Sequence, residues 1–471
     1  MNVLIVNTYG GSLILGAKVL KANIVATMED TGFGSDLQAL NFPKIPRYEK
    51  RADWPEKFST PWRGIDVVAH PPCAAFSIQN NVKAQRGTNT DAFSCHRKVM
   101  EYALGSKCRT LTIESVMGAY EAAHEEYEKA AEQYGYRVSY IMLNSVDFGV
   151  PQWRERIWIV FHKCKTFKAN CVPRRVTVGS IIDRTKAPIQ FDHFASTVME
   201  AFGSRITHDW HGNVYNQAKR QFGADNDTPR EFCAKYKICA PFISNAPCVL
   251  DHEGFANVLT ATSSWLDNSG RKPRIMSVEE YCAIMGFPRD YKWGKQIKKF
   301  RMYLSKGVCP PVATWIMKTV DKNASGWSGP FTHEESDFGG VIDLRPKKQE
   351  ALALANGRPW PPPGKVVVPR PPRALGERTG AVIKARRDPD APRGHRYVLV
   401  DEAKCKAPNS PQAAFMLTLL RKAGKAGMTR GEIVALAVKD PKGFPTNQPH
   451  DRAVGFFLSK FKGLGGLRFA E

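Results

Sequence analysis

The sequence predicts an α/β fold of the Rossmann-like type, in which helices cover a largely parallel sheet. The chain opens with an apolar strand, Asn2–Val6, followed by a glycine turn and an apolar helix that runs to Leu20. This order brings backbone close to a ligand in nucleotide-binding folds. Further apolar runs read as buried strands that end in turn-forming or polar residues. At 471 residues the chain exceeds one ordinary core, so we expect a large unit and a smaller one.

The first turn and the end of the second strand, Ile24–Met28, hold the first candidate ligand contacts. An acid at the end of the second strand binds ribose hydroxyls in such folds. A helix-capping role fits the spacing of these acids equally well. The candidates for a cofactor contact are Tyr9, Gly10, Gly11, Glu29 and Asp30.

A third strand, Ile65–Ala69, ends at Pro71 and Pro72, which cannot continue a central ladder. The turn presents the thiol of Cys73 at the carboxyl end of the strand, where open α/β sheets build their sites. A thiol there becomes a nucleophile if a neighbour stabilises its thiolate. The alternative is a small buried hydrophobic residue, the usual fate of an intracellular cysteine.

A helix over Asp91–Leu104 leads to the buried strand Thr110–Ile113, which ends in Glu114. In a parallel sheet this carboxyl group would lie near Cys73. An amphipathic helix over Ala119–Tyr134 follows.

The strand Val138–Asn144 and a turn precede Gln152, Arg154 and Arg156, which lead into the strand Ile157–Phe161. Two arginines at positions i and i+2 of a strand point to the same face. They suit an anion or a carbonyl oxygen, although a solvated edge-strand face is the ordinary alternative.

Together these segments resemble the DNA cytosine-C5 methyltransferase family. Five motifs carry the resemblance in the family's order, over about residues 1–322. They are Pro71–Cys73 (the nucleophile turn), Glu114–Val116 (for Glu-Asn-Val), Asp147–Arg156 (for Gln-x-Arg-x-Arg), Arg274–Pro288 (the scaffold of target recognition) and Leu304–Ala313 (for Gly-Asn-x-Val/Cys-Pro-Pro). The resemblance implies the Rossmann-like fold of methyltransferases that use S-adenosylmethionine, with a small target-recognition lobe.

The resemblance also implies a chemistry. Cys73 would add to C6 of a flipped cytosine in double-stranded DNA, and C5 would then take up the methyl group. Glu114 would be protonated, with a raised pKa, and would hydrogen-bond N3 of the base. Arg154 and Arg156 would brace the base carbonyl and the acid.

The cofactor motifs depart from the family. The usual Phe-x-Gly-x-Gly-Gly is replaced by Asn7–Ser12, and Gly-Asn by Ser305 and Lys306. Pro72, Lys306 and Val308 complete the expected cofactor contacts. A buried Lys306 would favour a donor with an extra carboxylate, carboxy-S-adenosylmethionine, and carboxymethyl transfer. Alternatively, Lys306 points outward or pairs elsewhere, or the chain is a DNA-binding relic without turnover.

We expect the catalytic part to span 1–189 and 258–324, with target recognition in 190–257. That region mixes basic and aromatic residues, as DNA-binding surfaces do. The candidate DNA contacts are Ser77, Gln152, Arg220, Arg230 and Lys235.

The tail is expected to begin with a basic, proline-rich linker over 325–399. Helices from Pro411, from Thr429 to Val438 and over Asp451–Phe461 then predict a winged-helix-like module over 400–471. The role of this module is either DNA contact or protein docking. Residues 341–471 hold 25 Lys and Arg against 11 Asp and Glu, a net charge of +14.

The net charge of +23 favours a polyanionic partner such as nucleic acid. Eleven cysteines without a CxxC pair, and no apolar leader at Met1, favour reduced thiols in the cytoplasm of a bacterial or phage-infected cell. No metal site, membrane span or obligate protein partner is expected.

Overall fold

A computed structural model describes residues 1–54, 64–77, 86–207, 209–222, 229–236, 247–261, 263–270, 272–325, 340–358, 396–399, 411–423, 428–440 and 467–469. The chain forms two compact units, Met1–Val367 and Val368–Glu471. Each unit is described by itself.

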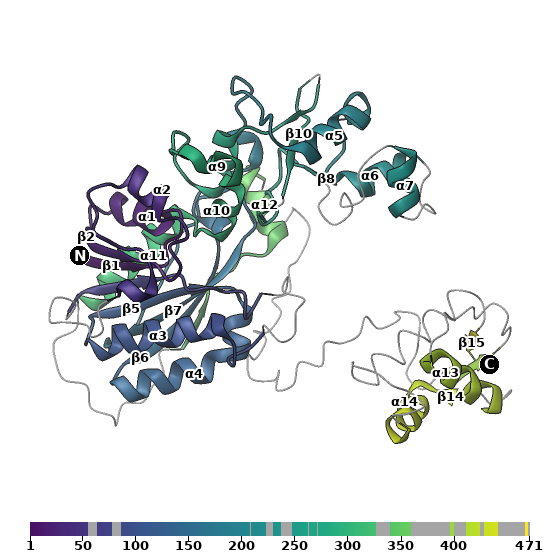
Figure 1. The fold of residues 1–471 in the computed structure, drawn as a ribbon, viewed down its shortest axis with the longest axis horizontal. Coiled ribbons are helices and arrows are strands. Elements are labelled where there is room, and N and C mark those ends of the chain that lie inside the picture. The colour runs from purple at the N-terminus through teal and green to yellow at the C-terminus, as the bar shows by residue number, and fades with distance from the viewer. Residues whose placement is uncertain are drawn as a thin grey trace. The chain divides into compact units, whose positions relative to one another are not determined.

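The larger unit is built on a sheet whose described strands follow the order β12-β6-β7-β5-β4-β1-β2-β3 (Figure 1). The strands are β1 (Asn2–Val6), β2 (Asn23–Met28), β3 (Arg47–Tyr48), β4 (Asp66–Ala69), β5 (Thr110–Ser115), β6 (Arg137–Asn144), β7 (Glu155–His162) and β12 (Val341–Asp343). All neighbours pair in parallel except β7, which runs antiparallel to β5 and β6. The Rossmann-like prediction therefore agrees with the observed sheet.

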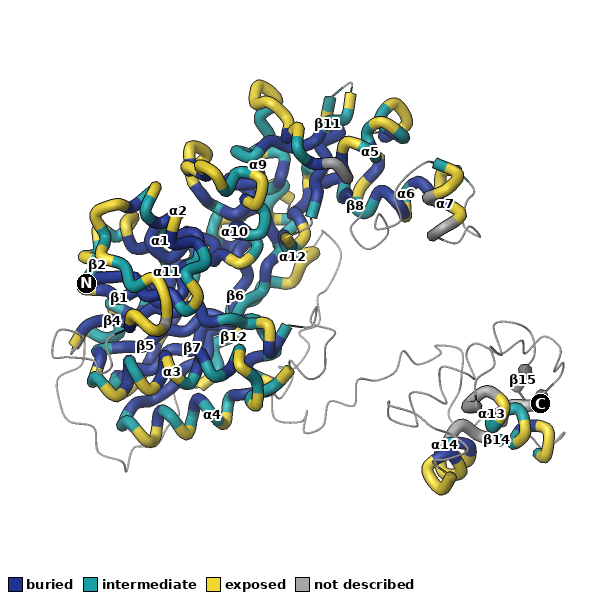
Figure 2. Tube along the Cα trace, in the orientation of Figure 1, coloured by how far each residue is buried: buried dark blue, intermediate teal, exposed yellow. Residues whose placement is uncertain are grey.

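Helices cover both faces of this sheet, as Figure 1 shows. One face carries α1 (Ser12–Val19), α2 (Ser35–Asn41) and α11 (Pro310–Ala324), and the other α3 (Asp91–Gly105) and α4 (Gly118–Tyr134). Along β1, Val3 and Ile5 pack into one apolar core while Leu4 and Val6 pack into the other. Burial on both faces explains why the strands are continuous apolar runs, drawn dark blue in Figure 2.

A smaller four-stranded sheet, in the order β11-β10-β9-β8, lies in the part of the chain where target recognition is expected. Its elements are α5 (His193–Phe202), β8 (Gly212–Asn213), α6 (Val214–Gln221), α7 (Pro229–Lys235), β9 (Cys248–Val249), β10 (Trp265–Asp267) and β11 (Arg274–Ile275). Because β9 pairs with β10 and β10 with β11, the lobe continues past residue 257. The predicted boundary at 257/258 is therefore wrong.

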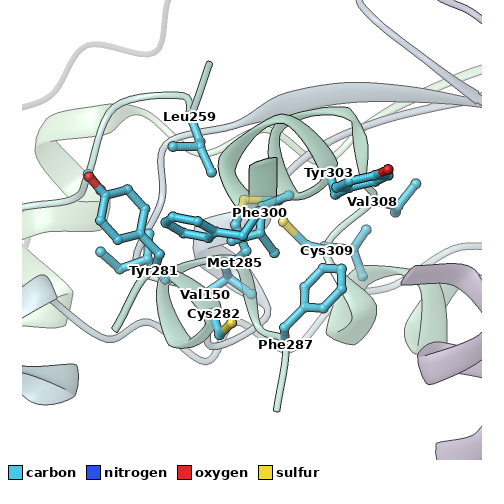
Figure 3. Close-up of a cluster of buried hydrophobic side chains, with 14 of the residues drawn as sticks. Val150, Leu259, Tyr281, Cys282, Met285, Phe287, Phe300, Tyr303, Val308 and Cys309 are labelled. Atoms are coloured by element: carbon cyan, nitrogen blue, oxygen red, sulfur yellow. The ribbon is translucent and has the colours of Figure 1, made fainter. Parts of the chain in front are cut away.

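A buried apolar cluster joins this lobe to the catalytic part (Figure 3). Tyr281 and Met285 lie on α9 (Val278–Met285), and Phe300 and Tyr303 lie on α10 (Phe300–Lys306). Figure 3 shows these side chains grouped with Val308, which lies within the Leu304–Ala313 motif. The cluster fixes the Ser305–Val308 segment beside the main sheet.

Part of the expected linker is ordered. β12 pairs in parallel with the edge strand β6, and α12 (Lys348–Ala355) follows it. Ala351 of α12 is buried with Val146 and Phe255. The linker prediction is wrong for residues 340–358, because their backbone bonds to the sheet edge.

In the second unit, β14 (Met428–Thr429), β13 (Arg396–Leu399) and β15 (Leu467–Phe469) form a small antiparallel sheet. Two helices, α13 (Pro411–Ala423) and α14 (Arg430–Lys439), match two of the three predicted. The third, over 451–461, lies outside the described residues, so the winged-helix assignment stays a prediction. In the described part of the chain, no helix combines the length and apolar composition needed to cross a membrane.

Candidate active site

The strand register aligns the carboxyl ends of β1, β4 and β5. Val6 pairs with Ala69, and Ala69 pairs with Ile113, which precedes Glu114. The residue that follows β4 is His70, whose backbone N–H donates to Val6 O at 3.0 Å. His70 therefore lies between the turn after β1 and Glu114 at the end of β5.

Glu114 is buried between two basic side chains. Its Oε2 lies 2.9 Å from Nε2 of His70, and its Oε1 lies 3.1 Å from Nε of Arg156. The Glu114 side chain is 1% exposed and that of His70 is 4% exposed. Since water is excluded, these contacts decide the charge of the carboxyl group.

Burial raises the pKa of Glu114, but the positive charges of His70, Arg156 and Arg154 outweigh it and hold this pKa below its ordinary value. The expected raised pKa is therefore wrong for this arrangement, because an ion pair forms where a dry pocket was expected. The same pairing acts on His70. Burial lowers the His70 pKa, yet Glu114 and Cys73 raise it to about 9.

Cys73 is half-buried on the turn that follows β4. Burial raises the pKa of its thiol, but the interaction with His70 and the positive charge of Arg156 bring it below the ordinary value. The turn itself is held by His96, whose Nε2 lies 3.4 Å from Pro72 O. Tyr127 contacts the other ring nitrogen of His96 at 3.0 Å. The thiol is thus placed and polarised for nucleophilic attack.

The two arginines diverge. Arg156 lies in β7 and reaches Glu114. Arg154 precedes the strand, and its Nη2 donates to Ser305 O at 3.1 Å and to Gly307 O at 2.8 Å. Their hydrogen-bond partners thus differ, and Arg154 holds the Ser305–Val308 segment. Both arginines still line one pocket with Glu114; its other walls are Leu143, Ser145, Trp158, Val308, Cys309 and Val312.

The expected cofactor loop is a left-handed turn held by Glu29. Tyr9 has φ 52° and Gly11 has φ 87°. The N–H of Tyr9 donates to Glu29 Oε1 at 3.1 Å, and Gln38 donates to the same oxygen at 2.6 Å. Burial raises the pKa of Glu29 well above its usual range. Glu29 therefore supports the loop, whereas Asp30 is only half-buried.

Gly34 lets two segments approach beside this loop. It has φ 89°, and a Cβ there would lie 2.0 Å from Tyr9 O. Gly10 is fastened from the opposite side, because the Tyr291 hydroxyl donates to Gly10 O. Val308 N donates to Ser12 Oγ at 3.1 Å, which ties the last motif to the start of α1.

Lys306 is exposed at the end of α10. Its Nζ lies 4.5 Å from the centre of the Phe33 ring, and this ring stacks on Tyr303 with centroids 4.5 Å apart. Of the alternatives for Lys306, the outward-pointing one therefore agrees with the structure and the buried one does not, since a cation over an aromatic ring remains hydrated on its outer side.

The expected DNA contacts are distributed unevenly. Gln152 is fully buried, so it is not on a DNA-facing surface. Ser77 is half-buried on the turn after Cys73, while Arg220 on α6 and Lys235 on α7 are exposed. Arg230 lies in α7, and its side chain lies outside the described residues.

Sequence reasoning missed His70, Gln38 and Phe33. The signal for His70 was present, because it directly precedes the Pro-Pro-Cys turn on a strand predicted to neighbour that of Glu114. Gln38 and Phe33 gave none, since their partners Glu29 and Tyr303 are set by packing.

Comparisons with known proteins identify the family of this chain. The chain is 35% identical over 115 residues to the type II methyltransferase M.AquIA of Picosynechococcus sp., which covers 22% of this chain and 45% of that protein. It is 28% identical over 114 residues to the type II methyltransferase M.NmeDI of Neisseria meningitidis serogroup C, covering 23% and 26%. The chain thus spans less than half of the length of these two relatives.

Solved structures of DNMT2 from Spodoptera frugiperda and of Dnmt2 from S. pombe are similar in fold. Their TM-scores are 0.47 and 0.42, each at 14% identity and over 68% of this chain, and the matches cover 99% and 98% of those chains. A family model for C-5 cytosine-specific DNA methylase matches residues 8–322, well over half of the sequence. The chain therefore belongs to the C-5 cytosine-specific DNA methylase family.

Proposed function

We propose that this chain transfers a methyl group from S-adenosylmethionine to C5 of a cytosine in double-stranded DNA, through a covalent adduct on Cys73. One observation carries the proposal. The turn after β4 holds a thiol of lowered pKa beside His70, which is ion-paired with Glu114, and Arg156 braces the same carboxyl group. A polarised thiol beside a buried acid is what addition to C6 and contact with N3 require.

The chemistry follows from these positions. The Cys73 thiolate adds to C6, and the electron pair released from the C5–C6 double bond makes C5 nucleophilic once N3 is protonated from the Glu114 side. Arg156 keeps Glu114 in place and offsets the negative charge that develops nearby. Glu114 is 1% exposed, so a stacked base cannot reach it and the cytosine is flipped into the pocket. Loss of the C5 proton and expulsion of Cys73 restore the ring.

The residues of the first loop fit a sulfonium nucleoside. Bound S-adenosylmethionine would supply an electrophilic methyl group. The start of α1, which lacks a side-chain cap from Gly11, suits its carboxylate, and Asp30 suits its ribose hydroxyls. Tyr9, Gly10, Pro72 and Val308 would complete the contacts.

Methyl is favoured over carboxymethyl as the transferred group. A carboxylated donor would need a cation directed into the cofactor site. Lys306 is exposed over Phe33, so its ammonium group is not a buried, unpaired charge that the carboxylate of the donor would neutralise.

Double-stranded DNA is favoured as the substrate by the family and by the net charge of +23. Arg220 and Lys235 are exposed on the recognition lobe, where they suit phosphate contacts, and we include Arg230 with them. Reduced cysteines fit a cytoplasmic setting. We assign the second unit to sequence-tolerant DNA contact, supported by its basic sequence.

Mass spectrometry of nucleosides tests the proposal. DNA is incubated with the full chain and with either S-adenosylmethionine or its carboxylated analogue. We expect 5-methylcytosine with the first donor. A carboxymethyl product with the second alone would overturn the assignment of the donor, and no product with either would favour a relic that binds DNA without turnover.

The covalent step is tested with DNA that contains 5-fluorocytosine, which cannot lose a proton from C5 and traps the adduct. Cys73→Ala should abolish both the adduct and the product while DNA binding persists. Cys171→Ala is the matched control, because this thiol is equally half-buried and is not among the residues assigned to the site. Product formation by Cys73→Ala would remove Cys73 as the nucleophile.

A further inference from the structure

His70 has a position that the proposed chemistry does not yet use. It immediately precedes the Pro71–Cys73 turn, and its imidazole is almost fully buried. Its Nε2 lies 2.9 Å from Glu114 Oε2, and His70 follows β4 directly and begins the turn that carries Cys73. The charges of His70 and Cys73 act on each other, raising the pKa of the imidazole and lowering that of the thiol. One titratable ring is therefore paired with the expected acid and coupled to the expected nucleophile.

The other groups around His70 leave this coupling undisturbed. Tyr9 presents its ring edge-to-face at 5.2 Å, and burial raises the pKa of its hydroxyl. Burial likewise raises the pKa of Glu29 well above its usual range and lowers the pKa of His96 to about 3. Of these neighbours, Glu114 and Cys73 are the ones whose negative charge balances a proton on His70.

We propose that His70 is the proton partner of Cys73 and Glu114: its imidazolium keeps Cys73 as a thiolate at rest and supplies, through Glu114, the proton that N3 of cytosine accepts. This inference rests on the proposed function, because it assigns the proton of that same reaction.

The step balances. At rest, His70 is a cation and both Glu114 and Cys73 are anions. As the S–C6 bond forms, the C5–C6 π pair shifts to C4–C5 and the C4–N3 π pair moves onto N3. The Nε2–H bond of His70 breaks in the same step: its proton passes to Glu114 Oε2, and Glu114 passes a proton on to N3 and so remains an anion. His70 ends neutral, and the net charge of −1 is unchanged. Expulsion of Cys73 reverses the path and recharges His70.

Alkylation of Cys73 tests the resting state without any methyl transfer. The full chain is treated with iodoacetamide across a pH series, and the Cys73 peptide is quantified by mass spectrometry. In the wild type, the midpoint should lie below the ordinary thiol value of about 8.5. A wild-type midpoint at or above that value would overturn the proposal without a variant.

His70→Gln should raise the midpoint by about one pH unit or more, which lowers the thiolate fraction at pH 7 about tenfold. His162→Gln is the matched control. This second buried histidine contacts Ser139 Oγ at 2.8 Å, at the opposite end of β7 from Arg156, so its loss should leave the midpoint unchanged. Equal shifts in both variants, or none in His70→Gln, would reduce His70 to a structural residue.

Trapping on 5-fluorocytosine DNA tests the relay. The wild type should form the adduct at a rate that is nearly constant from about pH 6 to 8, because the pKa of His70 lies near 9. His70→Gln should trap at least about tenfold more slowly at pH 6.5 and recover part of the rate as the pH rises. An identical profile in the variant would overturn the relay. If the wild type forms no adduct while its alkylation midpoint is low, the proposed function fails and the thiolate pairing stands.

Discussion

Replacing Arg154 by methionine separates what this buried guanidinium contributes to stability from what it contributes to the position of the Ser305–Val308 segment. The substitution removes hydrogen bonds to Ser305 O at 3.1 Å and Gly307 O at 2.8 Å. Hydrogen bonds to a charged group contribute about 1.5–3 kcal/mol each, so the loss is about 3–6 kcal/mol.

A second effect opposes this loss. Burial and the neighbouring charge of Arg156 lower the pKa of Arg154 to about 10. A depression of this size means that the site disfavours the cation by about 3 kcal/mol, a cost that methionine removes. The net decrease in the free energy of unfolding should therefore be only about 0–3 kcal/mol.

Function should suffer more than stability. The carbonyls that Arg154 holds precede Val308, whose N–H donates to Ser12 Oγ at the start of α1. We therefore expect the KM for S-adenosylmethionine to rise about tenfold or more, in initial rates measured alongside urea unfolding. Arg137→Met is the control, because this buried arginine donates to Lys165 O and is not among the residues assigned to the site. A loss above about 5 kcal/mol, or an unchanged KM, would refute the reasoning.

Two further predictions concern the loop and the lobe. Gly34→Ala should abolish cofactor binding in calorimetry, because its Cβ would lie 2.0 Å from Tyr9 O, whereas Gly64→Ala, also at positive φ but with nothing within 4 Å, should bind normally. Asp267→Asn should lower the free energy of unfolding by about 3–5 kcal/mol, since it removes a fully buried carboxylate that pairs with Arg184, Arg274 and His252, while Asp343→Asn at a more exposed pair should cost under about 1 kcal/mol. The pKa of Asp267 is held below its ordinary value, so the stabilisation by this carboxylate is complete above about pH 4 and is lost as the pH falls through the lowered pKa. In urea unfolding near pH 3, the difference in stability between Asp267→Asn and the wild type should therefore be smaller. An undiminished difference would contradict the assignment.

The sequence predicted the sheet well because buried parallel strands are continuous apolar runs with sharp ends. It also predicted that Glu114 neighbours the Cys73 turn, since adjacent parallel strands end at the same edge. It could not separate Arg154 from Arg156, because alternation holds only inside a strand and β7 begins at Glu155. The carbonyls that capture Arg154 lie about 150 residues further on, at a distance that local patterns do not reach.

The charge of Glu114 was missed for a related reason. Its pKa depends on His70, and although His70 directly precedes the Pro-Pro-Cys turn in the sequence, its contact with Glu114 is set by strand pairing. The strand β12 was missed because its three residues, between a stretch without Lys or Arg (326–340) and a basic one (345–348), carry no periodicity.

The short strand β12 has a consequence for where this chain can be shortened. Its backbone covers the outer edge of β6: Tyr140 N donates to Gly340 O at 3.0 Å, and Leu344 N donates to Met142 O at 2.8 Å. The family match ends at residue 322, before this strand. A truncation there would keep every family motif and yet leave β6 with an open, apolar edge, a template on which a second molecule can add its own strand. Removal of the segment beyond the family region should therefore favour self-association of the shortened chain.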